Sequence, residues 1–75
     1  MNKKEIPLED LSRGMKIVNT FNSLQNWKIG QVKKVYREYR WSKILWIQVQ
    51  GTNGIPYKIC LDTNKTKSVI IKSND

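Results

Sequence analysis

The sequence has 75 residues, which suffices for one small domain and is too short for two. Hydrophobic residues make up 39% of the chain, so we expect a folded domain and not a disordered tail. With one cysteine and no histidine, an internal disulfide and the usual zinc sites are excluded. No apolar stretch is long enough for a signal peptide or a membrane span. We therefore expect a cytoplasmic protein without a cofactor or metal, in which Cys60 is reduced and serves as a small packing residue.

The positive charge of the chain is large and unevenly placed. The net charge is +8, and residues 11–74 contain twelve Lys and Arg against only Glu38 and Asp62. A local charge of +10 favours a polyanionic partner such as nucleic acid or an acidic protein face. The alternative is that the charge only keeps a small protein soluble.

The predicted elements begin with a lead-in over 1–13. Pro7, Leu8 and Leu11 predict one helical turn, which Gly14 ends. After it the apolar period changes to two, and short runs rich in Val, Ile, Tyr and Trp alternate with turn residues. We predict five strands over 15–19, 28–36, 44–50, 56–61 and 68–72, and a frayed end over 73–75.

Two turns are predicted between the later strands. The tetrapeptide at 51–54, Gly-Thr-Asn-Gly, supplies two residues that accept positive φ and predicts a tight hairpin. Residues 62–65 predict a second such turn before the last strand.

Alternation assigns the faces of the central strands. Leu45, Ile47 and Val49 should point into the core, and the residues between them, including Trp46, should point outward. Val32 and Val35 are an odd number apart, so both can face inward only if a bulge intervenes at 33–34. Pairing Val35 with Ile47 then places Tyr36 beside Trp46 on the outer face, since pairing preserves sidedness.

The strand pattern predicts an all-β fold. Five short strands cannot hide both faces as an open sheet of this size, and curling into a small barrel is the simplest way to bury one face. We therefore predict a single five-stranded SH3-like barrel over 1–75. The alternative is an oligonucleotide-binding barrel, which normally has a helix where this chain has only a tight turn.

A basic and aromatic segment at 33–43 is the strongest functional signal. It holds five cations and three aromatic residues in eleven positions. Cations bind phosphates and aromatic rings stack on bases, so the mixture is typical of a nucleic-acid surface. The alternatives are that Tyr39 and Trp41 fold back to cap the barrel end, or that Arg packs on aromatic rings. The predicted binding residues are Lys33, Lys34, Tyr36, Arg37, Tyr39, Arg40, Trp41, Lys43, Trp46 and Lys58.

Trp27 lies at the junction between a polar loop and the second strand, where a core position is favoured over a contact position. Phe21 and Leu24 in that loop could pin it to the core or form one wall of a groove, and the sequence leaves both open.

Catalysis is disfavoured because the chain offers no nucleophile with a base and no carboxylate pair. We therefore do not expect an enzyme.

Two segments carry a resemblance to known families. LSRGMKIV at 11–18 and WKIGQVKKV at 27–35 resemble the opening of SH3-like and KOW-type barrels, with a turn glycine and a Gly-x-Val-x-x-Val pattern. Those barrels bind RNA, DNA or proteins such as RNA polymerase, so the resemblance implies the fold more than the partner. KKVYR at 33–37 is similar to a strand of archaeal chromatin barrels, which lay a sheet across the DNA minor groove. This chain departs from them by a longer hairpin and by having no helix after its last predicted strand.

These observations predict a non-enzymatic nucleic-acid-binding barrel of low sequence specificity, with DNA and RNA both open. The alternative is a protein-interaction module, such as a phage-type inhibitor, that grips an acidic protein surface. Membrane attachment is disfavoured because no amphipathic helix or acylation site is present. We expect a monomer or weak homodimer, and the composition suits a phage or a bacterial genome.

Overall fold

The computed structural model describes residues 2–21 and 27–73 and places them in one antiparallel sheet. Its six strands run in the order β1-β6-β2-β3-β4-β5, and one 3-10 turn, η1 (Leu8–Asp10), follows the first of them. The strands are β1 (Asn2–Pro7), β2 (Lys16–Val18), β3 (Ile29–Arg37), β4 (Ile44–Gly51), β5 (Pro56–Asp62) and β6 (Ser68–Ser73).

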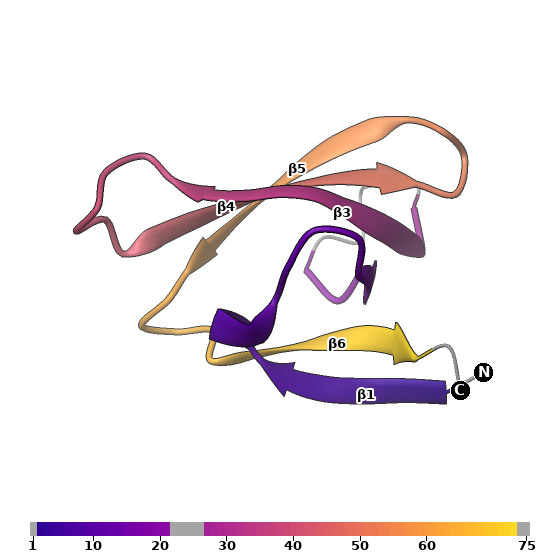
Figure 1. Ribbon diagram of the computed structural model, residues 1–75, viewed down its shortest axis with the longest axis horizontal. Helices are drawn as coiled ribbons and strands as arrows, with labels where there is room; N and C mark the ends of the chain where they lie inside the picture. Colours follow the sequence, from indigo (N-terminus) through magenta and orange to yellow (C-terminus); the bar gives the residue numbers. More distant parts are fainter. Residues whose placement is uncertain (1, 22–26, 74–75) are drawn as a thin grey trace.

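The sheet curls over on itself, as Figure 1 shows: β3, β4 and β5 form one layer, and β1 and β6 lie across from them. One hydrophobic core fills the space between the two layers. Because successive side chains of a strand point to opposite faces, every second residue of β4 enters this core. The buried apolar residues are Ile6, Leu8, Leu11, Ile17, Trp27, Val32, Leu45, Ile47, Val49, Ile59, Leu61 and Val69.

The predicted strands correspond to β2 through β6, and each boundary lies within one residue of its predicted position. The predicted register is also confirmed, because Val35 lies opposite Ile47 and Tyr36 lies opposite Trp46. Period-two alternation therefore located the strands, and, with Val35 paired with Ile47, conservation of sidedness placed Tyr36 and Trp46 together on the other face.

The predicted bulge in β3 is confirmed. The register with β4 shifts between Val32 and Lys34, so Lys33 is the extra residue. This extra residue lets two valines three positions apart face the same side: Val32 is fully buried, and Val35 packs partly against the core.

The predicted number of five strands is wrong, and the curled sheet does not close into a complete barrel. The sheet has six strands, and no pairing within the described part of the chain joins its two edge strands, β1 and β5. The second layer buries the inner face of β3, β4 and β5, so the curled sheet has a core without closing. The mainly β class and the short helical turn are as predicted.

The lead-in predicted over 1–13 forms its helical turn at η1, but Asn2–Pro7 are an additional strand, β1, paired with β6. Over 3–7, the part of this strand whose burial the structure describes, Ile6 alone is among the buried core residues, and it lies opposite Val69. An edge strand with one core residue has no apolar alternation, which is why the pattern missed it. The frayed end predicted over 73–75 is wrong at Ser73, which pairs with Asn2, and residues 74 and 75 lie outside the described ranges.

The turn predicted over 62–65 forms but does not make a hairpin. The backbone N–H groups of Lys65 and Thr66 donate to the Asp62 carbonyl at 3.0 and 2.8 Å, and the Asn64 N–H donates to the Asp62 Oδ1 at 2.8 Å. β5 pairs with β4, whereas β6 pairs with β1 and β2. The turn therefore carries the chain from one layer to the other.

The loop between β2 and β3 is tied to the core at both ends. The Asn19 side chain accepts a hydrogen bond from the Phe21 N–H at 3.1 Å and donates to the Trp27 carbonyl at 3.0 Å. Phe21 packs partly against the core, which is the first of the two roles proposed for it. Leu24 lies outside the described residues.

Trp27 is a core residue, as predicted, with only 2% of its surface exposed. Its ring stacks on Tyr57 at 6.0 Å between centroids and an interplanar angle of 30°. Gly30 and Gly51 lie opposite each other in the sheet, and a Cβ on either would come within 3.2 Å of Trp27 atoms. The two glycines therefore make room for the indole.

We expect Gly51→Ala to lower the free energy of unfolding by about 1–3 kcal/mol, because overpacking forces neighbours out of their positions. The added methyl group would lie 2.9 Å from the Trp27 Cβ and 2.8 Å from the Asn53 Oδ1. Urea denaturation followed by tryptophan fluorescence measures the change. Thr52→Ala, at an exposed position of the same turn, is the control and should change stability by less than about 0.5 kcal/mol. Equal stability of the two variants would contradict the tight packing at Gly51.

Candidate functional site

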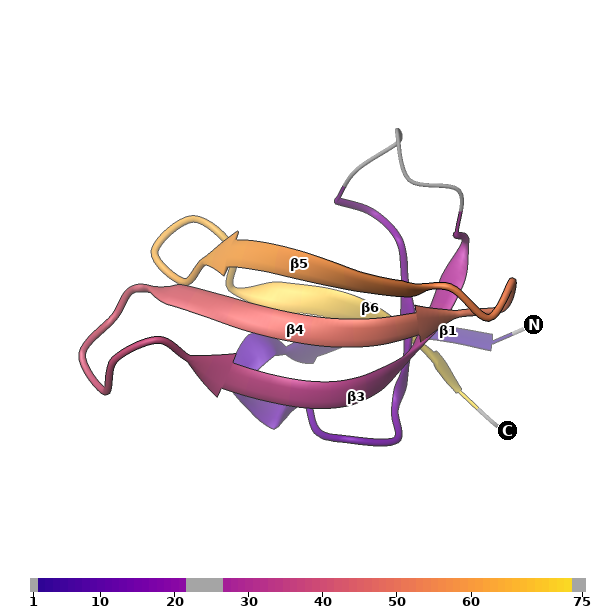
Figure 2. The same cartoon turned by 90° about the horizontal axis from the view of Figure 1, so that it is seen from above.

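The face of β3, β4 and β5 that points away from the core gathers many of the predicted binding residues. Figure 2, seen from above, shows these three strands side by side with the other layer behind them. Directly opposed residues of antiparallel strands share a face, so the register defines rows of side chains across it. We call this surface the outer face, and its three rows are Tyr36-Trp46-Cys60, Lys34-Gln48-Lys58 and Gln31-Gln50-Pro56.

The first row places two aromatic rings next to each other. Tyr36 and Trp46 are directly opposed and both half-buried, so each side chain leaves part of its surface in solvent. The Lys34 Nζ lies 5.0 Å from the centroid of the Tyr36 ring, within the range of a cation–π interaction. The row therefore combines stacking surface with positive charge.

Cys60 continues this row and is exposed, so the prediction that it packs in the core is wrong. Ile59 and Leu61 on either side of it are buried, and alternation along β5 sends Cys60 outward. The Cys60 thiol therefore lies on the outer face, in the row that begins with Tyr36 and Trp46, which we call the aromatic row.

The bulge concentrates lysines on the outer face. Lys33 and Lys34 are consecutive and both exposed, and the Lys33 Nζ donates to the Gln31 Oε1 at 3.1 Å. A hollow of about 500 Å³ opens beside the aromatic row, with Lys33 and Lys58 among the residues around it. Its remaining lining comes from Gln48, Val49, Gln50, Pro56 and Tyr57. The hollow thus joins two ammonium groups with two side-chain amides.

The tip of the β3–β4 hairpin projects beyond the rest of the sheet, as Figures 1 and 2 show. Its aromatic residues, Tyr39 and Trp41, stack on each other with centroids 5.5 Å apart and an interplanar angle of 11°. They are 55% and 80% exposed, so the alternative that they cap the end of the sheet is wrong. Arg40 between them is also exposed. The tip presents a preformed aromatic stack beside a cation.

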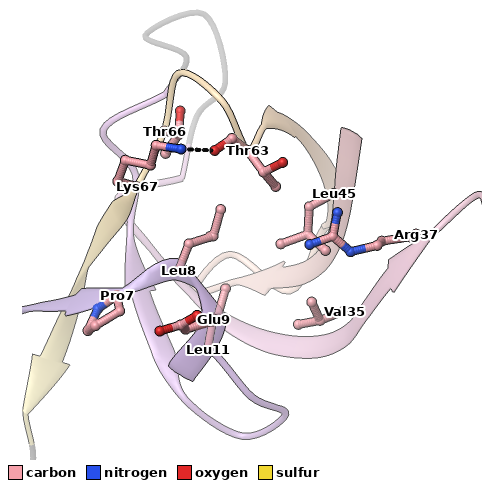
Figure 3. Close-up of a pocket in the computed structure, with 10 residues that line it drawn as sticks. All are labelled: Pro7, Leu8, Glu9, Leu11, Val35, Arg37, Leu45, Thr63, Thr66 and Lys67. Carbon is pink, nitrogen blue, oxygen red and sulfur yellow. Dashed lines mark hydrogen bonds between the residues drawn. The ribbon is translucent and has the colours of Figure 1, made fainter. Parts of the chain in front are cut away.

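Arg37 does not share the outer face with Tyr36. It lies opposite the buried Leu45, and Figure 3 shows its side chain beside that residue. The Arg37 Nη1 donates to the Ser42 carbonyl at 2.6 Å, so the guanidinium braces the hairpin tip from the other side of the sheet.

Lys43 lies at the base of the same tip, and its backbone is fixed from outside the hairpin. The Lys43 carbonyl accepts hydrogen bonds from the N–H and the Oγ1 of Thr63, both at 2.8 Å. The turn after β5 therefore supports the position from which the tip extends.

A second hollow, of about 510 Å³, lies beside η1 and is drawn in Figure 3. Leu8, Leu11 and Leu45 in its lining are each only 7% exposed, so little apolar surface is left for a small ligand. On its rim the Lys67 Nζ already donates to the Thr63 carbonyl at 3.0 Å. The other lining residues are Pro7, Glu9, Val35, Arg37 and Thr66.

The structure thus brings together five of the predicted site residues and separates the others from them. Lys33, Lys34, Tyr36, Trp46 and Lys58 share the outer face, whereas the exposed Tyr39, Arg40 and Trp41 form the hairpin tip. Sequence reasoning did not select Gln31, Gln48 and Gln50 as site residues. Period-two spacing from Trp46 would have indicated Gln48 and Gln50, and the confirmed bulge then places Gln31 opposite Gln50.

Comparison with protein-family models, with curated proteins and with solved structures finds no match to this chain. Within the residues that the structure describes, no group of three or more His, Cys, Asp or Glu side chains could hold a metal ion. In the same ranges, no helix has the length and apolar character needed to cross a membrane.

Proposed function

We propose that this protein is a non-enzymatic nucleic-acid-binding domain of low sequence specificity, with the outer face as its main binding surface. The observation that carries the proposal is the pair Tyr36 and Trp46, directly opposed on one face, with Lys34 and Lys58 in the adjoining row. Aromatic rings stack on bases of any sequence, and lysines bind phosphates with release of counterions. Together the two rows supply both contacts.

The hairpin tip supports the same proposal from a second position. Tyr39 and Trp41 are exposed and already stacked, so ordering them on a ligand costs little conformational entropy. Arg40, which lies between them in the sequence, supplies positive charge for a phosphate contact. A half-buried aromatic pair and an exposed aromatic stack on one basic domain are consistent with a ligand that presents repeated bases and phosphates.

For the finer fold, we propose that β2 through β6 form an SH3-like, half-open barrel to which β1 adds an outer strand. The support is that β6 returns across the core to pair with β2, the first of these five strands. Barrel-like curling of this kind buries one face of a small sheet. The resemblance of 11–18 and 27–35 to SH3-like and KOW-type openings agrees with this assignment.

We expect Trp46→Leu to weaken binding of labelled oligonucleotides by about 5- to 150-fold, the loss of one stacking contact, while leaving the salt dependence unchanged. Lys58→Gln should instead lower the slope of log K against log salt by about 0.7–0.9, the loss of one phosphate contact. Fluorescence anisotropy titrations at several salt concentrations measure both quantities.

The matched control is Lys4→Gln, which removes the same charge from an exposed position of β1 at the opposite edge of the sheet. It should leave both the affinity and the slope near their wild-type values. If Lys4→Gln and Lys58→Gln lower the slope equally, the outer face is not the binding surface. If no nucleic acid binds at about 150 mM salt, the proposal fails. A pull-down from nuclease-treated lysate would then test for an acidic protein partner.

A further inference from the structure

We propose that the outer face binds a single, unpaired strand, with bases stacked on the Tyr36–Trp46 row and a further base edge contacting the glutamine amides of the adjoining hollow. This inference rests on the proposed function and names its ligand class. Three features of the outer face carry it: its width, the spacing of its rows and the chemistry of its hollow.

The width of the face disfavours insertion into the major groove of a duplex. Neighbouring strands are about 4.8 Å apart, so the axes of β3 and β5 are separated by about 10 Å before side chains are added. The major groove is about 12 Å wide and admits a helix or a two-stranded ribbon. A three-stranded layer that carries Tyr, Trp and Lys side chains is wider than this groove.

The aromatic residues are also poorly shaped as wedges for the minor groove. Wedges that unstack a base step project freely from the protein, whereas Tyr36 and Trp46 are half-buried on the sheet. Trp41 is exposed, but it is already stacked on Tyr39, which doubles the thickness to be inserted. Rings placed in this way offer flat surfaces to bases that are already free.

The spacing of the rows fits a strand whose bases are separated from one another. Tyr36 and Lys34 are two residues apart on β3, as are Trp46 and Gln48 on β4, so adjacent rows are about 6.7 Å apart. Bases in a duplex strand follow each other every 3.4 Å. Consecutive bases can therefore reach consecutive rows only if they are unstacked from each other, which an extended single strand allows.

The hollow beside the aromatic row is suited to the edge of an unpaired base. Gln48 and Gln50 line it, and a side-chain amide offers both donors and an acceptor, which can match the polar edge of an unpaired base such as adenine. The Gln50 Nε2 donates to the Gly54 carbonyl at 3.4 Å, which leaves its second N–H and its Oε1 for a base. Lys33 and Lys58 also line the hollow and can contact the flanking phosphates. In a duplex the Watson–Crick edges are paired, and the remaining base edge lies inside a major groove that is too narrow for this three-stranded face. The contact therefore needs the base to be free.

The test compares one sequence of about 12 nucleotides as a single strand and as a blunt duplex, in DNA and in RNA, by fluorescence anisotropy at about 150 mM salt. We expect at least about tenfold tighter binding of the single strand, and we expect Trp46→Leu to remove most of that preference. Single-stranded homopolymers of the same length, titrated in the same way, measure base preference. Gln48→Met, which keeps side-chain length but removes the amide, should weaken single-strand binding and reduce the difference in affinity between these homopolymers, with an unchanged salt slope. Thermal unfolding of each variant confirms that it remains folded.

Equal or tighter binding of the duplex, with the same dependence on Trp46, would overturn the inference and leave the proposed function intact. Binding to neither form would overturn the proposed function, and the inference with it. A Gln48→Met variant with wild-type affinity and base preference would remove the hollow from the binding site and overturn that part of the inference.

Discussion

Replacing Trp27 with alanine is expected to lower the free energy of unfolding by about 3–5 kcal/mol, the usual effect of deleting a buried large aromatic side chain. The indole is 2% exposed, stacks on Tyr57, and fills the space left by Gly30 and Gly51. A domain of 75 residues has a total stability of about 4–11 kcal/mol, so much of it would be lost. Urea denaturation monitored by circular dichroism measures the change.

The matched control for this prediction is Trp41→Ala, which makes the same chemical change at a residue that is 80% exposed. We expect Trp41→Ala to alter stability by less than about 0.5 kcal/mol. A Trp27→Ala protein with the same denaturation midpoint as Trp41→Ala would show that the core does not depend on the indole.

Deleting Lys33 is expected to abolish the native fold or to leave it only partly populated. The deletion removes the bulge, and a one-residue slip in a strand sends its side chains to the opposite face. Either Val32 leaves the core or Val35 does, and a polar neighbour takes the vacated inner position. Circular dichroism and the dispersion of amide NMR signals report the loss.

Two controls separate the effect of losing the bulge on stability from the effects of losing a positive charge and of shortening the chain. Lys33→Ala keeps the residue count and should change stability by less than about 0.5 kcal/mol, because Lys33 is exposed. Deletion of Arg40 shortens the same hairpin by one cationic residue at its exposed tip, where loops tolerate length changes. A folded protein without Lys33, with stability equal to the protein without Arg40, would contradict this account of the bulge.

Much of the layer formed by β3, β4 and β5 could be predicted from the sequence because one rule, period-two alternation, applies along these strands. The bulge at 33–34 follows from keeping apolar residues on one face, and the neighbourhood of Tyr36 and Trp46 follows once Val35 is paired with Ile47. The same rule places Arg37 on the side of β3 away from the outer face and sends Cys60 outward. The common burial of cysteine was given more weight, so the packing role predicted for Cys60 is wrong, whereas the phosphate contact predicted for Arg37 stays a prediction.

Other features have no periodic signal in the sequence. β1 buries too few residues to alternate, and the open edges of the sheet depend on how far the layers curl, which no local pattern specifies. The stack of Tyr39 on Trp41 arises within a loop, where the backbone path and not a repeat determines which side chains meet. These are the places where tertiary geometry, and not strand propensity, decides the result.

The position of β6 between β1 and β2 has a consequence for the order in which the domain assembles. β2–β3, β3–β4 and β4–β5 are hairpin pairs of neighbouring segments and can zip up from their own turns. β6 must cross the core to reach β2, and the hydrogen bond from the Ser68 Oγ to the Glu5 Oε2 joins residues 63 positions apart. Closing so long a loop costs more chain entropy than closing a hairpin, so the four-stranded meander can form early and act as the template on which β6 and β1 are laid down.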